Sequence, residues 1–178
     1  MKTIRTSVRW ALSIGAALLA SNATAGIPSA ASACVSDLVE TTPSSDFTAL
    51  EGGSVVRHEP TGLEWRRCAE GMSWTGTSCT DRPIYQSWQG ALQYANTVSG
   101  WRLPNVKELH SIVENCRIAP AINQQVFPGT PSSNFWSASP YAGTSGAAWP
   151  VNFQTGGGVF SAATFTIRTP IRLVRGGE

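Results

Sequence analysis

The sequence predicts an α+β fold in which two helices pack on a small, looped antiparallel sheet. Residues 87–99 and 105–115 carry apolar side chains at helical spacing. Past Pro120 the chain becomes a run of short β-prone pieces between Gly-, Ser- and Pro-rich joints. Because the helical segments precede this run of strands instead of alternating with it, an α/β fold is excluded.

The first 25 residues have the three-part layout of a secretory signal peptide. Three basic residues precede the apolar run WALSIGAALLA, and Ala23 and Ala25 form an A-x-A cleavage pattern. The apolar run is shorter than the roughly 20 residues that span a bilayer, although an uncleaved membrane anchor is the alternative. We therefore expect a signal peptide over 1–25, a short spacer over 26–33 and a single domain over 34–178. The protein would be exported to the periplasm, the cell surface or the medium.

The charge balance argues against nucleic-acid binding. The whole chain has 13 basic and 11 acidic residues, a net charge of +2. Three of the basic residues and none of the acidic ones lie in the predicted signal peptide, which leaves ten and eleven, a net charge of −1. Binding to nucleic acid needs a dense basic surface that neutralises phosphates, and this composition does not supply one.

The four cysteines predict two disulfides. An even number of cysteines in an exported chain indicates a disulfide framework, and four cysteines allow three pairings. Cys68 and Cys79 flank the turn-rich stretch AEGMSWTGTS, which favours a local bridge and leaves Cys34 to pair with Cys116. A zinc site is the rival interpretation, but there is no C-x-x-C pair, so we predict no metal.

Residues 54–66 predict a β-hairpin. The strand SVVRH leads into the turn Glu59-Pro60-Thr61-Gly62, and the return strand LEWR places Leu63 and Trp65 on one face. The turn-rich segment that precedes the hairpin, residues 34–53, is expected to wrap the domain without regular structure.

A sharp corner precedes the second helix in the stretch SGWRLPNVKEL. Pro104 disfavours helical geometry at Leu103, so the residues before it are extended. Asn105 and Glu108 have the spacing of a capping box, which starts a helix expected to run to about Asn115. The residues of this structural corner are Trp101, Arg102, Leu103, Pro104, Asn105 and Glu108. The remaining strands are expected at NFWSAS, AAWPVNF, GVFSAA and IRLVR.

Several ordered motifs resemble the Lcl C-terminal domain family. They are CVSDLVETTPSSDF, TGLEWRRCAEGMSWTGTSC, WRLPNVKELHSIV, PAINQQVFP, FWSASPYAG, AWPVNF and IRLVR, which together span about residues 34–175. That family takes its name from the end domain of a bacterial collagen-like adhesin. The corner and the IRLVR ending also resemble elements of the formylglycine-generating-enzyme fold. The resemblance implies a C-type-lectin-like architecture, and for the ligand it implies a glycan, with sulfated glycosaminoglycans as one class.

No catalytic residue is predicted. The reactive cysteines of the formylglycine-generating enzymes lie near the end of the domain, and no cysteine follows Cys116 here. His58 lies in a predicted strand and His110 on the second helix, where it is expected to be partly exposed. Glu108 and Glu114 are six residues apart and face different directions on a helix, so they do not form a catalytic pair. The calcium-binding loop of C-type lectins is also missing, and we expect no cofactor.

The residues that remain for ligand binding are Trp74 and three arginines. Trp74 lies inside the predicted Cys68–Cys79 ring, where it could stack on a sugar or a partner, or fold back on its own hairpin. The other tryptophans of the domain are expected to build the core. Arg168, Arg172 and Arg175 are candidate anion contacts. The alternative role of Arg172 and Arg175, as strand residues, is a salt bridge or a capped loop end.

The sequence therefore predicts a non-enzymatic exported binding module that recognises a glycan or a cell-envelope protein. A structural or assembly subunit of a surface organelle is the alternative, and an enzyme of the formylglycine-generating-enzyme fold is a third. We expect no nucleic-acid partner and no permanent membrane span after cleavage of the signal. Homo-oligomers would strengthen weak single contacts.

Overall fold

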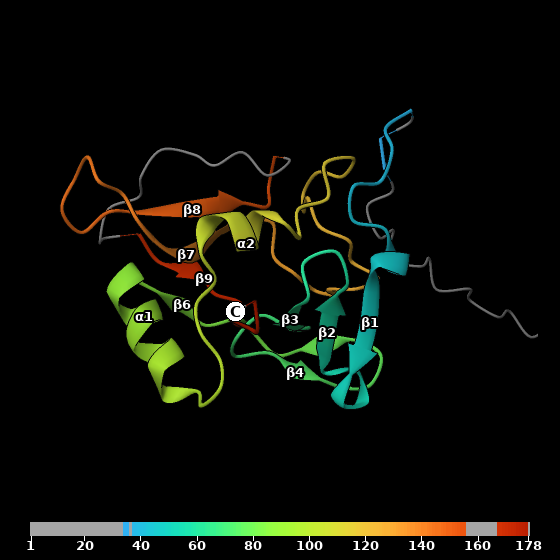
Figure 1. Cartoon of the computed structure of the whole chain (residues 1–178), viewed down its shortest axis with the longest axis horizontal. Coiled ribbons are helices and arrows are strands. Elements are labelled where there is room, and N and C mark those ends of the chain that lie inside the picture. The colour runs from blue at the N-terminus through green and yellow to red at the C-terminus, as the bar shows by residue number, and fades with distance from the viewer. Residues whose placement is uncertain (1–33, 36, 156–166, 178) are drawn as a thin grey trace, which may run out of the picture.

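The computed structural model describes residues 34–35, 37–155 and 167–177. The predicted signal peptide, the spacer and the predicted strand at 158–163 lie outside these residues. The described chain is an α+β domain with two α-helices and two disulfides, as the sequence predicted, and its strands form several small antiparallel sheets (Figure 1). None of its helices is long and apolar enough to cross a membrane.

The largest sheet has four strands in the order β1-β2-β3-β10. They are β1 (Phe47–Leu50), β2 (Val55–His58), β3 (Leu63–Arg66) and β10 (Val174–Arg175). The predicted hairpin is confirmed: β2 and β3 pair in antiparallel register, and the Gly62 N–H donates to the His58 carbonyl over 2.8 Å. The segment before the hairpin is only partly irregular. The prediction missed β1, which follows a short 3-10 turn and pairs along the free edge of β2.

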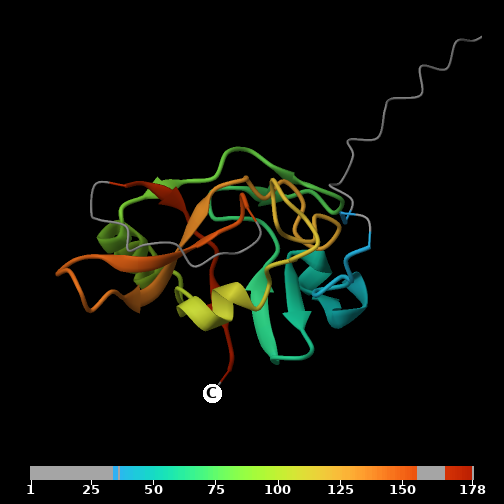
Figure 2. The same ribbon diagram turned by 90° about the horizontal axis from the view of Figure 1, so that it is seen from above.

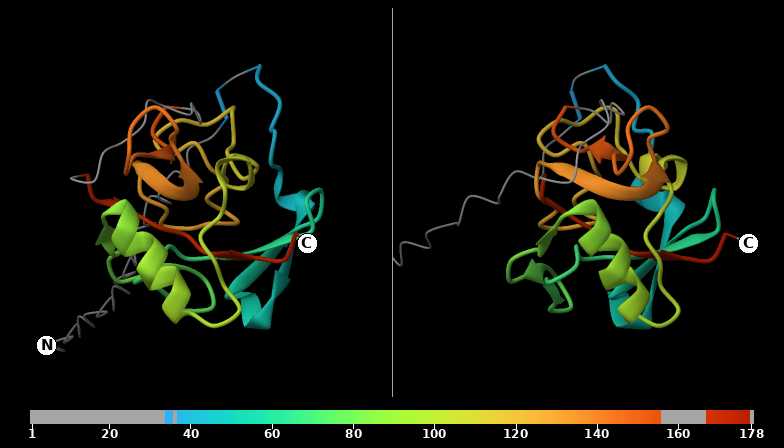
Figure 3. Two further views of the ribbon diagram at one scale, coloured as in Figure 1. Left: turned by 60° about the vertical axis from the view of Figure 1, so that its left-hand side comes forward. Right: turned by 90° about the vertical axis from the view of Figure 1, so that its left-hand side faces the viewer.

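The other strands form three separate pairs and not the single small sheet that the sequence predicted. The pairs are β4 (Ser73–Trp74) with β5 (Cys79–Thr80), β6 (Tyr85–Gln86) with β9 (Thr169–Pro170), and β7 (Asn134–Pro140) with β8 (Ala148–Asn152). The C-terminal segment connects two of these sheets, because it crosses the molecule from β9 beside α1 (Trp88–Thr97) to β10 at the main sheet (Figure 3). Only Val174 and Arg175 of the predicted strand IRLVR are therefore in strand conformation.

Helix α1 begins where the sequence places it. The Ser87 side chain accepts a hydrogen bond from the Gly90 N–H over 3.2 Å and caps the helix. Helix α2 (Val106–His110) is shorter than predicted. The Ser111 hydroxyl donates to the Glu108 carbonyl, and the Glu114 N–H bonds the carbonyl of Ala121 instead of continuing the helical ladder. The predicted apolar residues beyond α2 are still buried.

The corner before α2 is confirmed and has one ion pair that the sequence did not indicate. Asn105 and Glu108 form the reciprocal capping box, with distances of 2.9 and 2.7 Å. Both oxygens of Glu108 also accept from the guanidinium of Arg102 over 2.7 Å. Burial alone would raise the pKa of Glu108, but Arg102 and the Asn105 N–H hold it below its usual value. The extended residues before Pro104 are thus held against helix α2 by the Arg102–Glu108 ion pair, in addition to the bend that Pro104 imposes.

Two apolar clusters form the core. One lies between the main sheet, α2 and the following loops around Trp65, Phe127 and Phe153. The other packs against α1 around Trp136, Ile171 and Leu173. Figure 2 shows α1 and the β7–β8 pair on one side of the molecule and strands β1 and β2 on the other. Trp65 and Trp136 are fully buried, whereas Trp88, Trp101 and Trp149 are half-buried at the margins.

The cysteines pair as the local-bridge interpretation predicted. Cys68 bonds Cys79 across the β4–β5 hairpin, and Cys34 bonds Cys116 across a separation of 82 residues. No described cysteine is free. The second bridge holds the N-terminal arm, residues 34–46, against the loop after α2, where the Val35 N–H also donates to the Cys116 carbonyl over 2.7 Å.

Candidate functional site

Trp74, the aromatic candidate, folds back on the domain. Its indole N–H donates to the Gly52 carbonyl over 3.1 Å, and the Arg67 guanidinium lies 4.6 Å from the ring centroid. Gly53 packs so closely on the indole that an added Cβ would lie 3.1 Å from its nitrogen. Trp74 therefore folds back on its own domain, which is one of the two arrangements that the sequence left open. The ring remains half-exposed and lines a pocket.

The three candidate arginines do not form one anion-binding surface. Arg168 is exposed. Arg175 is held in ion pairs, with Glu64 at 2.7 Å and with Glu51 at 2.5 Å. These ion pairs are the alternative role that the sequence left open for this residue.

Arg172 is 1% exposed, so the prediction that it meets an outside ligand is corrected. Its guanidinium donates to the carbonyls of Arg66 and Arg67 and, over 2.7 Å, to the Thr130 hydroxyl. The same group lies 4.7 Å from the ring centroid of Phe127. Burial lowers the pKa of Arg172 to about 9, while the charge of Glu70 raises it. The residue faces inward because the C-terminal segment crosses between two core clusters.

A small pocket lies between the β4–β5 hairpin and the end of β3, and we call it the hairpin pocket. Its volume is about 100 Å³. The lining combines two charged side chains, a disulfide, a thioether and an indole: Ser54, Arg66, Cys68, Ala69, Glu70, Met72 and Trp74. Sequence analysis found Trp74 but not the two charged residues, since no motif marks them.

The loop that lines the pocket, residues 67–74, is fixed from several sides. Cys68 is tied to β5, and Arg172 holds the carbonyls at the end of β3. The Glu70 N–H donates to the Ile171 carbonyl, and its own carbonyl accepts from the Ile84 N–H over 2.9 Å. Gly71, at φ +89°, approaches Ile84 so closely that an added Cβ would lie 2.8 Å from it. The pocket is therefore formed before any ligand arrives.

Glu70 is the unusual residue of the hairpin pocket. Its side chain is 3% exposed, and Oε2 accepts from the Tyr94 hydroxyl over 3.0 Å. Oε1 has no hydrogen-bond partner among the described residues, and neither has Nε of Arg66, which lies 3.7 Å from it. Burial raises the pKa of Glu70, although Arg66, Tyr94 and Arg172 act in the opposite direction. The two atoms thus face each other in a buried ion pair that is longer than a hydrogen bond.

Trp101, flanked by two arginines, lies next to the hairpin pocket on the outer face of the main sheet. The guanidinium groups of Arg66 and Arg175 lie 5.0 and 4.6 Å from the centroid of Trp101. A shallow pocket of about 210 Å³ lies beside them, lined by Gly100, Trp101, Arg102, Arg175 and Gly176. Since Arg102 and Arg175 are already paired with glutamates, this surface has little positive charge to offer an anion.

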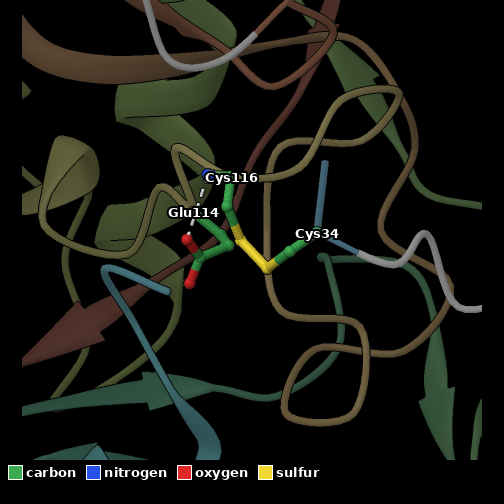
Figure 4. A group of neighbouring side chains, drawn as sticks. All are labelled: Cys34, Glu114 and Cys116. Carbon is green, nitrogen blue, oxygen red and sulfur yellow. Dashed lines mark hydrogen bonds between the residues drawn. A yellow bond between two sulfur atoms is a disulfide. The ribbon is translucent and has the colours of Figure 1, made fainter. Parts of the chain in front are cut away.

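One group of side chains has the composition of a metal site but not its chemistry. Cys34, Glu114 and Cys116 lie within 4.8 Å of one another (Figure 4). The two sulfurs are joined in a disulfide and provide no thiolate. Both carboxylate oxygens of Glu114 accept hydrogen bonds from Thr41 and Thr42, and Oε1 also accepts from the Cys116 N–H over 3.2 Å. The group anchors the N-terminal arm.

The histidines lie apart from the hairpin pocket. His58 is buried, stacks on Phe47 at 4.8 Å between centroids and contacts the Thr61 hydroxyl over 2.9 Å. Burial lowers the pKa of His58, while Asp46 and Glu59 raise it. His110 is exposed at the end of α2, as expected.

Comparison with known families agrees with the motifs. Residues 54–175, about two thirds of the chain, match the sequence profile of the Lcl C-terminal domain. The chain belongs to the Lcl C-terminal domain family. This match covers the main hairpin, the hairpin pocket, both helices and β10, and it begins after the N-terminal arm that the Cys34–Cys116 bridge attaches. No curated protein matches the chain.

Proposed function

We propose that this Lcl C-terminal domain protein is a non-enzymatic, exported binding module of the bacterial envelope or surface that recognises a glycan or a protein partner. The observation that carries the proposal is the hairpin pocket, which is preformed and lined by an indole and two charged side chains. Closed disulfides in both pairs support an oxidising compartment outside the cytoplasm. A C-type-lectin-like architecture is part of the proposal.

A binding role is favoured over catalysis by the placement of the reactive residue types. The four cysteines are oxidised and cannot act as nucleophiles. His58 is packed against Phe47 in the main sheet, and His110 lies on the outside of α2. Neither histidine lines the hairpin pocket, whose only titratable lining groups are Glu70 and Arg66. We therefore propose recognition without turnover.

The pairing of arginines with glutamates favours a neutral ligand over a polyanion. Five arginines of the described chain pair with glutamates: Arg57, Arg66, Arg102, Arg117 and Arg175. Arg172 is buried. Exposed ion pairs would have to open before their arginines could meet sulfate groups, and this reduces the gain from binding a sulfated chain.

The test is an array of neutral and sulfated glycans, probed with the oxidised protein at low and at physiological salt, with a pull-down from envelope extracts in parallel. We expect retention of a neutral glycan or of one defined envelope protein at physiological salt. Failure to bind anything in either arm, together with turnover of a small substrate, would contradict the proposal.

A second role, in assembly of a surface structure, is favoured by one observation. Large apolar side chains are exposed on both sides of the Cys34–Cys116 bridge: Val35, Leu38 and Val39 on the N-terminal arm, and Ile118 on the loop after α2. An exposed apolar group of this kind is typical of a protein contact. Size-exclusion chromatography with light scattering, on the wild type and on Val39→Ser, tests whether the arm mediates self-association.

A further inference from the structure

The outer edge of β1 is the edge of the main sheet that no described residue covers. At the opposite edge, the N–H and the C=O of Arg102 both bond Val174, over 2.9 and 3.0 Å, and this bridge closes β10. No described segment forms such a bridge beside β1. Thr48 and Ala49 are both exposed although their side chains point to opposite faces, and β1 lies at the margin of the molecule (Figure 1, Figure 2). An open sheet edge is a template for pairing with another strand.

The hydrogen bonds on the inner side of β1 identify the backbone groups on its outer edge. The Glu59 N–H donates to the Asp46 carbonyl over 2.9 Å, and β1 and β2 then pair in unbroken antiparallel register. Because the residues of an antiparallel pair exchange bonds at every second position, the even-numbered residues of β1 bond toward β2. The backbone groups of Phe47 and Ala49 therefore point away from the sheet.

Two of the outward groups are already bonded. The Phe47 N–H donates to the Ser44 carbonyl, and the Glu51 carbonyl accepts from the N–H and the hydroxyl of Ser54 over 3.3 and 2.9 Å. The last residue of the strand is extended, so the Glu51 N–H also points outward. Four groups remain without a partner among the described residues: the Phe47 C=O, the N–H and C=O of Ala49, and the Glu51 N–H.

This row of groups is self-complementary about Ala49. A two-fold axis at Ala49 sets this residue against Ala49 of a second copy, and Phe47 against Glu51 of that copy. Each Ala49 N–H then donates to the facing Ala49 C=O, and each Glu51 N–H donates to the facing Phe47 C=O, so all four groups of both copies are bonded. A register displaced by two residues forms only half of these bonds, because the Phe47 N–H and the Glu51 C=O are already occupied.

The side chains of β1 do not obstruct a second strand. Its sequence, FTAL, contains no charged residue, proline or bulge, which are devices that prevent edge pairing, and its one protective feature is a length of four residues. Ala49 is small, and an added Cβ at Gly52 would meet nothing within 4 Å. Phe47 packs on His58 and Phe127 at 4.8 and 5.4 Å between ring centroids, which keeps the strand in place.

We propose that β1 pairs with β1 of a second copy of this chain, in antiparallel register about Ala49, and so joins two four-stranded sheets into one continuous sheet. The groups that carry this interface are backbone atoms of β1 and of the turn after it, not the exposed apolar side chains of the N-terminal arm. The inference goes beyond the proposed binding function and does not depend on it. A dimer presents two hairpin pockets, which raises the avidity for a ligand with repeated units.

The experiment measures the mass of the oxidised protein, purified from a bacterial periplasm, by sedimentation equilibrium at loads from about 10 µM to 1 mM. A short strand pair is a small interface, so we expect a weak monomer–dimer equilibrium within this range. A protein that remains monomeric at about 1 mM would overturn the inference. A trimer would overturn it as well, because pairing about a two-fold axis closes after two copies.

Substitutions of Ala49 test the register. In Ala49→Pro the lost N–H is one that points outward, so the β1–β2 ladder stays intact while the dimer loses two bonds, and dimerisation should weaken about tenfold or more. Ala49→Ser is the matched control, because it keeps the N–H, and it should dimerise as the wild type does. Ala49→Glu sets two carboxylates against each other at the axis, so its dimer should be weaker at about 0.05 M than at about 0.5 M NaCl.

Other outcomes separate this inference from the rest of the account. Val39→Ser should dimerise as the wild type does; if it is monomeric while Ala49→Pro and Ala49→Glu still dimerise, the N-terminal arm mediates association and the inference fails. A monomeric protein whose Ala49 and Glu51 amides shift in NMR spectra only when an envelope protein is added has a different chain on this edge, which also overturns it. Glycan or protein binding by a strictly monomeric protein would overturn the dimer and leave the proposed function standing.

Discussion

Arg172 can be tested as the buried support of the pocket loop by changing it to methionine. Its three hydrogen bonds, at about 2 kcal/mol each for a charged donor, contribute roughly 6 to 7 kcal/mol, and the stack on Phe127 adds about 1. Against this stands the cost of burying the charge. Lowering the pKa of Arg172 from its usual value to about 9 corresponds to about 5 kcal/mol at 1.36 kcal/mol per unit.

The balance predicts that Arg172→Met destabilises the domain by about 3 kcal/mol, or roughly 6 to 12 °C in Tm for a domain of this size. Urea unfolding of the oxidised protein, followed by tryptophan fluorescence, measures the difference. Arg168→Met is the matched control, since Arg168 is exposed and should change stability by less than about 0.5 kcal/mol. If Arg172→Met were as stable as the wild type or more stable, the burial cost would outweigh the bonds and the support role would be refuted.

Three further changes have defined outcomes. Glu114→Gln should cost about 2 kcal/mol at pH 7, because an NH₂ group then faces donors of the N-terminal arm. Burial would raise the pKa of Glu114, but its N–H donors lower it below the usual 4.5, so its stabilisation is lost as pH falls from 4.5 through that lowered pKa, and the difference between the two proteins in urea unfolding should shrink over this range. Gly71→Ala should cost about 2 kcal/mol or more in the same assay, because the new Cβ meets Ile84 at φ +89°; equal stability would contradict a fixed loop. The lowered pKa of His58 predicts that stability declines as pH falls from 6.5 towards that pKa, and His58→Phe should remove this slope from unfolding curves measured between pH 7 and pH 5.

The elements that the sequence predicted well are those set by local chemistry. Pro104 and the capping pair of Asn105 and Glu108 determine the corner within a few residues, and Gly62 determines the hairpin turn in the same way. The Cys68–Cys79 bridge was also predictable, because it closes a short turn-rich loop. Contacts between neighbours along the chain leave patterns that a sequence shows.

The parts that the sequence missed depend on distant contacts. Helix α2 ends before Glu114, whose N–H bonds Ala121 and whose carboxylate bonds Thr41 and Thr42, 73 and 72 residues away, and no helical pattern indicates these contacts. Arg172 looks like a surface strand residue until the crossing of the C-terminal segment places it between two clusters. The charged residues of the hairpin pocket were missed for the same reason, since Glu70 differs from a surface glutamate only through its burial beside Arg66.

The measurement that tests the central claim most directly is a map of the ligand contact by NMR. Amide shifts of the ¹⁵N-labelled, oxidised protein would be followed during titration with whichever glycan or partner the array and pull-down identify. The account predicts that the largest changes cluster at Ser54 and residues 66–74, around the hairpin pocket. Changes centred instead on Arg168 or on the β7–β8 hairpin, with residues 66–74 unaffected, would contradict it.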